Sequence, residues 1–347
     1  MMTLGALMNQ EMNEQPAILV QSIARWEEDV ASIQAILPPQ LLGVVFVGRG
    51  SSDNAATIGR YTVEAFTGIP ASLAAPSLST RYAPGVSYEN YLVVALSQSG
   101  GTPEIIAAAK AVTGKGSRLI SITNNRDSEL GSIADLHLFL GAGVEKAVPA
   151  TKTVTAQILS ILAITSAIAL SRGLPSPISQ DELEKVPVAV QEILDNFEPV
   201  RELVSRWKNS NRLQVVGRGL VYGAILEAAL KIKETTGVFS QGISCADLVH
   251  GPIAAIDPQL PVLIFDSGER NSEELVALTQ RLEGMGADVA TSSADQKSTL
   301  PLPNYLPEVL NAFSVTVRGQ QLSYEWALQL GRNPDSPEGL SKMTLTY

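Results

Sequence analysis

The sequence predicts an α/β protein made of two copies of one unit, each a flavodoxin-like parallel sheet with helices on both faces, in three αβα layers. Three observations support this fold class. At 347 residues the chain exceeds one ordinary domain. It contains an internal repeat, and its short Val/Ile/Leu runs end in Gly or Ser before Ala-rich helical stretches. Such apolar runs are typical of parallel strands buried on both faces.

The repeat has an offset of 169 residues. Residues 43–70 and 213–237 share a Gly-Arg-Gly sequence and a later glycine: Gly48-Arg49-Gly50 corresponds to Gly217-Arg218-Gly219, and Gly68 to Gly237. The next apolar runs keep nearly the same offset. We therefore expect an N-terminal helical segment over 1–34, a first domain over 35–172, a second over 188–332 and a tail over 333–347. Residues 171–187, rich in Ser and Pro, would link the domains.

Composition excludes several classes of function. The net charge is −10 and no basic cluster stands out, so we expect no nucleic-acid partner. The single cysteine, Cys245, and the lack of a signal-like start predict a reducing, cytoplasmic location. The uncharged run 153–170 approaches the length of a membrane span, but its Thr, Ser and Gln residues favour a buried helix and no membrane. No His, Cys and carboxylate cluster has metal-ligand spacing, so we expect no metal and no cofactor.

A candidate phosphate site follows the strand predicted at 91–96. The turn Ser97-Gln98-Ser99-Gly100-Gly101-Thr102 opens a helix, with Thr102 as its N-cap, and offers hydroxyls, an amide and backbone N–H groups. Ser51 and Ser52 follow the first strand in the same way and would complete the site. The alternative is a polar strand-to-helix loop that Thr102 merely caps.

The second unit carries candidate catalytic groups. Glu227, Lys231 and Glu234 are spaced four and three apart, so they share one face of a helix. A carboxylate beside a lysine suits proton transfer between neighbouring carbons, although a solvated salt-bridged face has the same pattern. His250 precedes Gly-Pro and would lie on a turn, whereas His137 alternates like a structural strand residue. Lys342 reads as an ordinary surface residue of a loop-like tail.

Six motifs in order resemble the isomerase half of glucosamine-6-phosphate synthase and its stand-alone relatives with two SIS domains. The likeness covers nearly the whole chain. The motifs are the start at 8–16, Ser97-Gln-Ser-Gly-x-Thr102, Ala150-Thr151-Lys152, Leu226-Glu-x-Ala-Leu-Lys-x-Lys-Glu234, His250-Gly-Pro252 and Asp335-x-Pro337-x-x-Leu340-x-Lys342.

The resemblance implies a phosphorylated hexose or amino hexose as substrate and a role for each matched residue. Phosphate would be bound by Ser52, Ser97, Gln98, Ser99 and Thr102, with Ser51 beside the sugar. Glu234 would be the base at C1 and C2, supported by Lys231 and Glu227. His250 would assist ring opening in the neighbouring subunit's site, which implies a homodimer. Lys342 would contact the sugar from the tail.

Departures from the synthase pattern bear on the reaction. This chain has Gly101, Gln241 and Val249 where the synthase usually has Glu, Glu and Lys. The synthase also draws ammonia from glutamine with an amino-terminal cysteine, but this chain begins Met1-Met2-Thr3 and its only cysteine lies deep in the second unit. We therefore expect no glutamine use. The reverse reaction, glucosamine 6-phosphate plus water to fructose 6-phosphate plus ammonia, needs no ammonia donor.

Two alternatives remain open. One is another isomerase or lyase on this scaffold: a deglycase for sugar-amine 6-phosphates, a galactosamine-phosphate relative, or a synthase-like enzyme fed ammonia. The other is a non-catalytic sugar-phosphate sensor. The joint presence of Glu234, His250 and Lys342 favours an enzyme.

Overall fold

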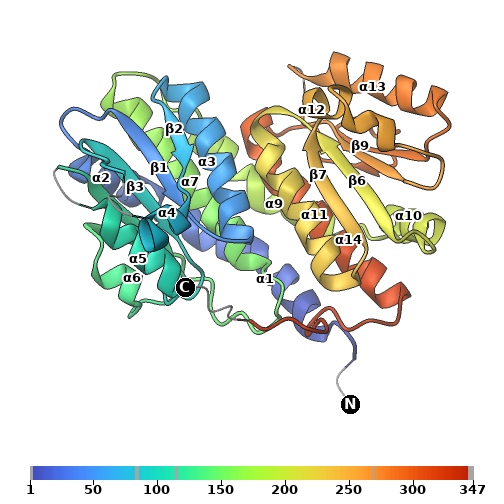
Figure 1. Cartoon of the computed structure of the whole chain (residues 1–347), viewed down its shortest axis with the longest axis horizontal. Helices are drawn as coiled ribbons and strands as arrows, with labels where there is room; N and C mark the ends of the chain where they lie inside the picture. Colours follow the sequence, from blue (N-terminus) through green and yellow to red (C-terminus); the bar gives the residue numbers. More distant parts are fainter. Residues whose placement is uncertain (1–2, 83–85, 114–115, 269, 343–347) are drawn as a thin grey trace. The chain divides into compact units, whose positions relative to one another are not determined.

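The structure, a computed structural model, describes residues 3–82, 86–113, 116–268 and 270–342. The chain divides into two compact units (Figure 1). The sheet A unit contains Ala17–Glu145 and Lys152–Leu183, and the sheet B unit contains Met1–Pro16, Lys146–Thr151 and Glu184–Lys342. Each unit is described separately.

Sheet A has five parallel strands in the order β2-β1-β3-β4-β5. Its strands are β1 (Gly43–Val47), β2 (Ala71–Leu73), β3 (Tyr91–Leu96), β4 (Arg118–Thr123) and β5 (Leu136–Phe139). Its helices are α2 (Trp26–Ile36), α3 (Ser51–Thr67), α4 (Pro76–Arg81), α5 (Pro103–Val112), α6 (Glu129–Ser132), α7 (Lys152–Ser171) and α8 (Gln180–Leu183), together with the part of α1 (Ala6–Ile23) that follows Pro16. All five residues of β1 are buried, as strands covered on both faces require.

Sheet B has the order β10-β9-β8-β6-β7, again parallel throughout. Its strands are β6 (Arg212–Gly217), β7 (Phe239–Ser244), β8 (Val262–Phe265), β9 (Val289–Ser293) and β10 (Leu300–Pro301). Its other elements are α9 (Lys185–Asp195), α10 (Glu198–Trp207), η1 (Gly219–Val221), α11 (Tyr222–Thr236), α12 (Cys245–Val249), η2 (Pro252–Ala255), α13 (Ser272–Gly284), η3 (Glu308–Leu310) and α14 (Asn311–Gln329). Read from its other end, sheet B repeats the order of sheet A, which confirms the predicted fold class.

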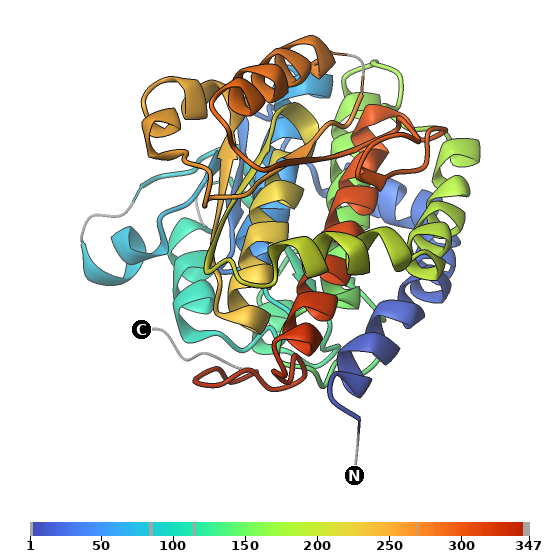
Figure 2. The same cartoon turned by 90° about the vertical axis from the view of Figure 1, so that its right-hand side faces the viewer.

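Helices cover both faces of each sheet. In sheet A, α5 and α6 contribute to a core with β1 and β3, while α3 and α7 pack against each other on the other side. In sheet B, α12 and α13 form a core with β6 and β8. The opposite face holds α11, which contacts β6 and β7 and lies beside α14 (Figures 1 and 2). Both α3 and α11 end at a left-handed glycine, Gly68 and Gly237, as the repeat predicts.

The uncharged run of the sequence forms α7. This helix is long and apolar enough to cross a bilayer by length and composition, and 89% of its most apolar window is buried in the protein. The buried hydroxyl of Thr165 lies 3.0 Å from that of Thr62 on α3. The expectation of a buried helix over 153–170 is therefore confirmed.

Candidate functional site

The serine-rich loop and the Gly-Arg-Gly loop lie at one edge of sheet A. β1 and β3 are hydrogen-bonded neighbours with Val47 opposite Ala95, so both strands end at the same edge. β1 leads to Ser51 and Ser52 in the first turn of α3, and β3 leads into residues 97–102 before α5. Ligands of doubly wound sheets bind at this carboxyl edge, between strands whose helices cover opposite faces. We name this set of residues, 48–52 with 97–102, the cradle.

Hydrogen bonds fix the hydroxyl groups of the cradle. The Ser97 hydroxyl accepts from the Gly100 N–H at 3.1 Å and lies 3.3 Å from the Thr102 hydroxyl. Ser99 accepts from the Gly101 N–H at 3.2 Å. The Ser52 hydroxyl accepts from Gln157 of α7 at 3.0 Å. Ser52 and Ser97 are buried, while Ser51, Gln98, Ser99 and Thr102 are half-buried. The structure thus gathers all the predicted phosphate residues in one unit.

Thr102 is at the N-cap of α5, as predicted, but its side chain makes no capping bond to the helix. Its hydroxyl contacts Ser97 instead. The prediction that the Thr102 side chain caps the helix, which both interpretations of this loop share, is therefore wrong. Ser128, by contrast, caps α6 by accepting from the Gly131 N–H. An anion at the start of α5 could take the place that a capping oxygen would occupy.

Two glycines allow the cradle to close on itself. A Cβ at Gly48 would lie 2.9 Å from the backbone of Ser52 and Asp53, so no other residue fits there without a shift of the chain. Gly100 has φ +64°, and a Cβ there would lie 2.4 Å from that of Ser128. The tight turns therefore require glycine at both positions.

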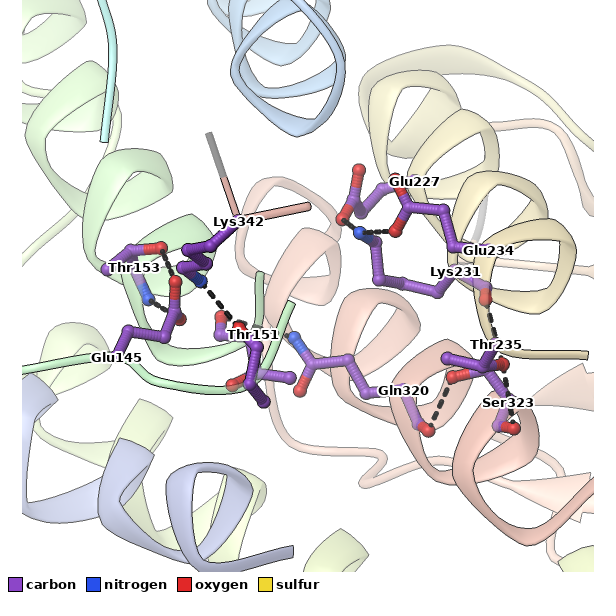
Figure 3. A network of polar contacts seen from close by, with 11 residues as sticks. Glu145, Thr151, Thr153, Glu227, Lys231, Glu234, Thr235, Gln320, Ser323 and Lys342 are labelled. Carbon is purple, nitrogen blue, oxygen red and sulfur yellow. Dashed lines mark hydrogen bonds and ion pairs between the residues drawn. The ribbon is translucent and has the colours of Figure 1, made fainter. Parts of the chain in front are cut away.

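A buried charge cluster lies on α11 in the sheet B unit. The side chains of Lys231 and Glu227 are 1% and 2% exposed, and Lys231 Nζ lies 3.5 Å from Glu227 Oε1. Lys231 also makes an ion pair with Glu234, whose side chain remains 25% exposed. Figure 3 shows the ammonium group between the two carboxylates. The three residues share one helix face as predicted, but the alternative of a solvated surface face is wrong.

Packing of α11 on α14 explains this burial. A Cβ at Gly319 would lie 2.5 Å from that of Ala228, so the two helices approach closely only because residue 319 is glycine. Thr235 donates to the Ser323 carbonyl at 3.0 Å (Figure 3). Glu234, three residues before the Gly237 cap, keeps one side open to solvent. A partly shielded carboxylate beside a fixed ammonium can accept and return a proton.

Lys342 is held by a hydrogen bond within the sheet B unit, to which α11 also belongs. Its ammonium donates to the Ala147 carbonyl at 2.7 Å. The preceding tail is attached through Asp335, whose carboxylate accepts from the Met8 N–H at 2.7 Å and whose carbonyl accepts from the Val148 N–H at 2.9 Å. Lys342 is half-buried and bonded to the protein's own backbone, and its contact with the sugar stays a prediction. The rest of the predicted tail, 343–347, lies outside the described residues.

His250 lies at the other edge of sheet B from Glu234. α11 returns from β6 to the start of β7, so Glu234 is near the amino edge; His250 follows β7 and α12, at the carboxyl edge. The six residues of β7 separate the two edges by about 20 Å. His250 is exposed and faces a pocket of about 470 Å³, which is also lined by Arg218, Cys245, Val249, Glu274 and Arg281. One chain's sheet B unit therefore does not bring His250 to Glu234.

Sequence reasoning missed two buried carboxylates that hold these segments. Glu145, in the sheet A unit, accepts from the N–H and the hydroxyl of Thr153 and so caps the start of α7 (Figure 3). Glu11, in the sheet B unit, accepts from the N–H groups of Lys146 and Ala147. Neither residue has a local sequence signal, since the partners of Glu145 lie 8 residues away in the chain and those of Glu11 lie 135 or more away. His137, by contrast, has the structural place predicted, bonded to Thr123 at 2.8 Å within sheet A.

Two homologous doubly wound sheets with a serine-rich strand-to-helix loop define the class of this protein. The SIS domain family matches residues 43–167 and 208–301. The chain therefore belongs to the SIS domain family.

Relatives and solved structures agree with this assignment. The chain is 31% identical to a glutamine–fructose-6-phosphate aminotransferase (isomerizing) of Gloeobacter violaceus, over 96% of this chain and 58% of the relative. It thus spans less than two thirds of the relative's length. The C-terminal domain of the Francisella tularensis glucosamine-fructose-6-phosphate aminotransferase superposes with a TM-score of 0.87 at 23% identity, covering 95% of this chain and 98% of that one. A glucosamine-6-phosphate deaminase from Thermotoga maritima gives 0.75 at 24%, covering 96% and 100%. At these identities the two structures show the shared fold alone.

Proposed function

We propose that the chain is a phosphosugar isomerase acting on an amino sugar phosphate, and that it converts glucosamine 6-phosphate and water to fructose 6-phosphate and ammonia. The observation that carries the proposal is the Glu227–Lys231–Glu234 cluster. Burying this ion-paired set costs desolvation free energy that a purely structural helix face would avoid. The partly exposed carboxylate of Glu234 at the end of the cluster is the kind of base that an aldose–ketose isomerase requires.

Each residue of the proposed site would have its own role in the reaction. The cradle would hold the phosphate of the substrate through hydroxyl and N–H donors. Glu234 would take the proton from C2 of the open-chain amino aldose and return it to C1, which moves the carbonyl function to C2 as an imine. Water then adds to C2, ammonia leaves, and the ketone of fructose 6-phosphate remains. Lys231 would keep the Glu234 carboxylate in place, and Lys342 would contact the sugar.

His250 would act in the site of a second copy of the chain. Ring opening of a closed aminosugar needs a group that exchanges protons near neutral pH, and imidazole suits that task. Since His250 and Glu234 lie at opposite edges of sheet B, we propose a homodimer in which each subunit supplies His250 to its partner.

A substrate comparison tests the reaction. The purified chain is incubated with glucosamine 6-phosphate, galactosamine 6-phosphate or a fructosyl-amine 6-phosphate, and ammonia and ketose phosphate are both measured. We expect equal amounts of ammonia and fructose 6-phosphate from the first substrate, and none from a Glu234→Gln control. Turnover of only the fructosyl-amine would instead identify a deglycase. Binding of all three without turnover would identify a sensor.

A further inference from the structure

Arg49 and Glu104 join the two halves of the cradle. The Arg49 Nε lies 3.0 Å from Glu104 Oε2, and its terminal nitrogen lies 3.0 Å from Oε1, so the pair is bidentate. Arg49 stands in the loop after β1, two residues before Ser51, and Glu104 stands in the first turn of α5, two residues after Thr102. Planar two-point pairs of this kind fix both direction and distance.

The position of Glu104 is unfavourable for an anion site. Its side chain is only 8% exposed, so water screens its charge poorly. A carboxylate in the first turn favours the helix itself, but it repels a phosphate at the same helix end. Asp53, in the first turn of α3, adds a second carboxylate beside the cradle; burial raises its pKa, and the Arg49 guanidinium acts in the opposite direction. The positive charge of Arg49 thus offsets the negative charges of Glu104 and Asp53, which lie in the first turns of the two helices that begin at the cradle.

Sheet B carries the same ion pair without a cradle. Arg218, the repeat counterpart of Arg49, pairs with Glu274 in the first turn of α13. At the position that corresponds to Ser97, however, sheet B has Asp266, whose carboxylate accepts from the Gly268 N–H at 3.0 Å and from the Ser272 hydroxyl at 2.9 Å. The Asp266 carboxylate thus accepts the hydrogen bonds that these loop donors could otherwise give to a bound anion. Sheet B therefore provides an internal comparison: it has the arginine–glutamate pair but a carboxylate where sheet A has Ser97.

We propose that Arg49 is a positioning residue for the substrate phosphate: it neutralises Glu104 at the start of α5, so that a phosphate dianion can bind beside a buried carboxylate. This inference rests on the proposed function, because it assumes that the cradle is the phosphate site. Arg49 keeps 45% of its side chain exposed, so the guanidinium can also present its outer edge to the ligand.

The test measures the binding of inorganic phosphate to the full chain by calorimetry. Arg49→Gln should weaken binding about 10- to 100-fold, as loss of a charge-assisted interaction does. Glu104→Gln removes the repelling charge and should stay within about threefold of the unaltered chain. The double variant Arg49→Gln/Glu104→Gln should recover most of the affinity that the single arginine variant loses.

Recovery in the double variant separates neutralisation from mere support of the fold. If the pair only held the loops together, Glu104→Gln would weaken binding as much as Arg49→Gln, and the double variant would be no better. Either result overturns the proposal, as does normal phosphate binding by Arg49→Gln. Arg49→Lys keeps the charge and should retain binding, and thermal midpoints establish that each variant is folded. If Arg49→Gln does not fold, the double variant decides: weak binding there overturns the proposal.

A matched control uses the sheet B pair. Arg218→Gln removes the corresponding guanidinium, and phosphate binding should not change.

Ser99→Ala and Thr102→Ala test the cradle separately. If these two bind phosphate normally, the cradle is not the phosphate site, and the proposed function loses that element. If they bind weakly while Arg49→Gln binds normally, only the role of Arg49 is refuted.

Discussion

Glu234 and His250 lie at opposite edges of sheet B, with the whole of β7 between them. Glu234 is near the end of α11, which leads into β7, and His250 caps the end of α12, which follows it. A strand of six residues spans about 20 Å, far beyond the reach of any side chain. Two residues proposed for one reaction can then meet only if they come from different subunits.

Complementation between inactive variants follows from this geometry. In a mixed dimer of Glu234→Gln and His250→Asn chains, one site combines the intact Glu234 of one chain with the intact His250 of the other. Random mixing of equal amounts should therefore restore about one quarter of full activity on glucosamine 6-phosphate, because half the dimers are mixed and each has one complete site. The measurement is ammonia release after the variants are mixed under conditions that exchange subunits.

The outcome distinguishes shared from unshared sites. If each chain used its own His250, every site in the mixture would lack one group and no activity would return. Mixing Glu234→Gln with Lys342→Ala provides a further comparison, because it shows whether the tail lysine acts on its own subunit's Glu234.

Glu234→Gln should separate binding from chemistry. The amide keeps the size of the side chain but cannot accept the C2 proton, so turnover should fall by roughly 10²–10⁴ while KM changes little. Steady-state kinetics of fructose 6-phosphate formation provide both values. Glu283→Gln, on the exposed part of α13, is a suitable control and should leave both unchanged. Near-normal turnover in a folded Glu234→Gln protein would show that α11 does not supply the base.

Lys231 should be important for stability as well as for the reaction. Lys231→Met removes the ammonium from between two carboxylates, one of them 2% exposed, and should lower the free energy of unfolding by about 3–5 kcal/mol. Adding Glu227→Gln to this variant removes the buried charge and should restore part of the loss. Urea unfolding followed by circular dichroism measures both. Equal stability of Lys231→Met and the unaltered chain would contradict the cost assigned to the buried cluster.

Local patterns were enough to predict the fold. The 169-residue offset of Gly48-Arg49-Gly50 and Gly217-Arg218-Gly219 predicted two equivalent units, and the two sheets do share one strand order. The cradle was predictable because its serines follow directly from strand ends, which a parallel sheet brings to one edge. The helix spacing likewise placed Glu227, Lys231 and Glu234 on one face.

Burial and long-range contacts could not be predicted. Spacing on α11 does not reveal that α14 covers the charges, because the contact depends on Gly319, some ninety residues away. The Arg49–Glu104 pair joins residues 55 apart, and Asp335 bonds the N–H of Met8, 327 residues distant. These partners are set by the tertiary fold and leave no periodic trace in the sequence.

The cradle hydroxyls should contribute directly to affinity. Ser99→Ala and Thr102→Ala each remove one donor, and each should weaken substrate binding by about ten- to a hundredfold. Ser77→Ala, on the exposed helix α4 of the same unit, is a matched control that should bind normally. Inhibition of turnover by inorganic phosphate offers an independent readout, since a weakened cradle also releases a competing anion.

Cys245 should make the fold sensitive to alkaline pH. The residue is 3% exposed, its thiol lies 3.5 Å from a Glu274 oxygen, and burial raises its pKa above the ordinary value of 9.0. The unfolded chain therefore loses the thiol proton at lower pH than the folded chain does. Stability linked to this thiol is fully present below pH 9.0 and falls as pH rises through the folded pKa, because the folded state then holds more protons.

Cys245→Ser tests this linkage. Serine keeps a hydroxyl that can donate to Glu274 but does not ionise in the range studied, so the loss of unfolding free energy above pH 9.0 should be smaller than in the unaltered chain. Tyr88, Tyr305 and Tyr324 do not confuse the comparison, since burial raises the pKa of each above 10.0 and both proteins contain all three. If the unfolding free energies of the two proteins fell in parallel above pH 9.0, the thiol would not be ionised on unfolding. Another group would then cause the loss of stability at alkaline pH.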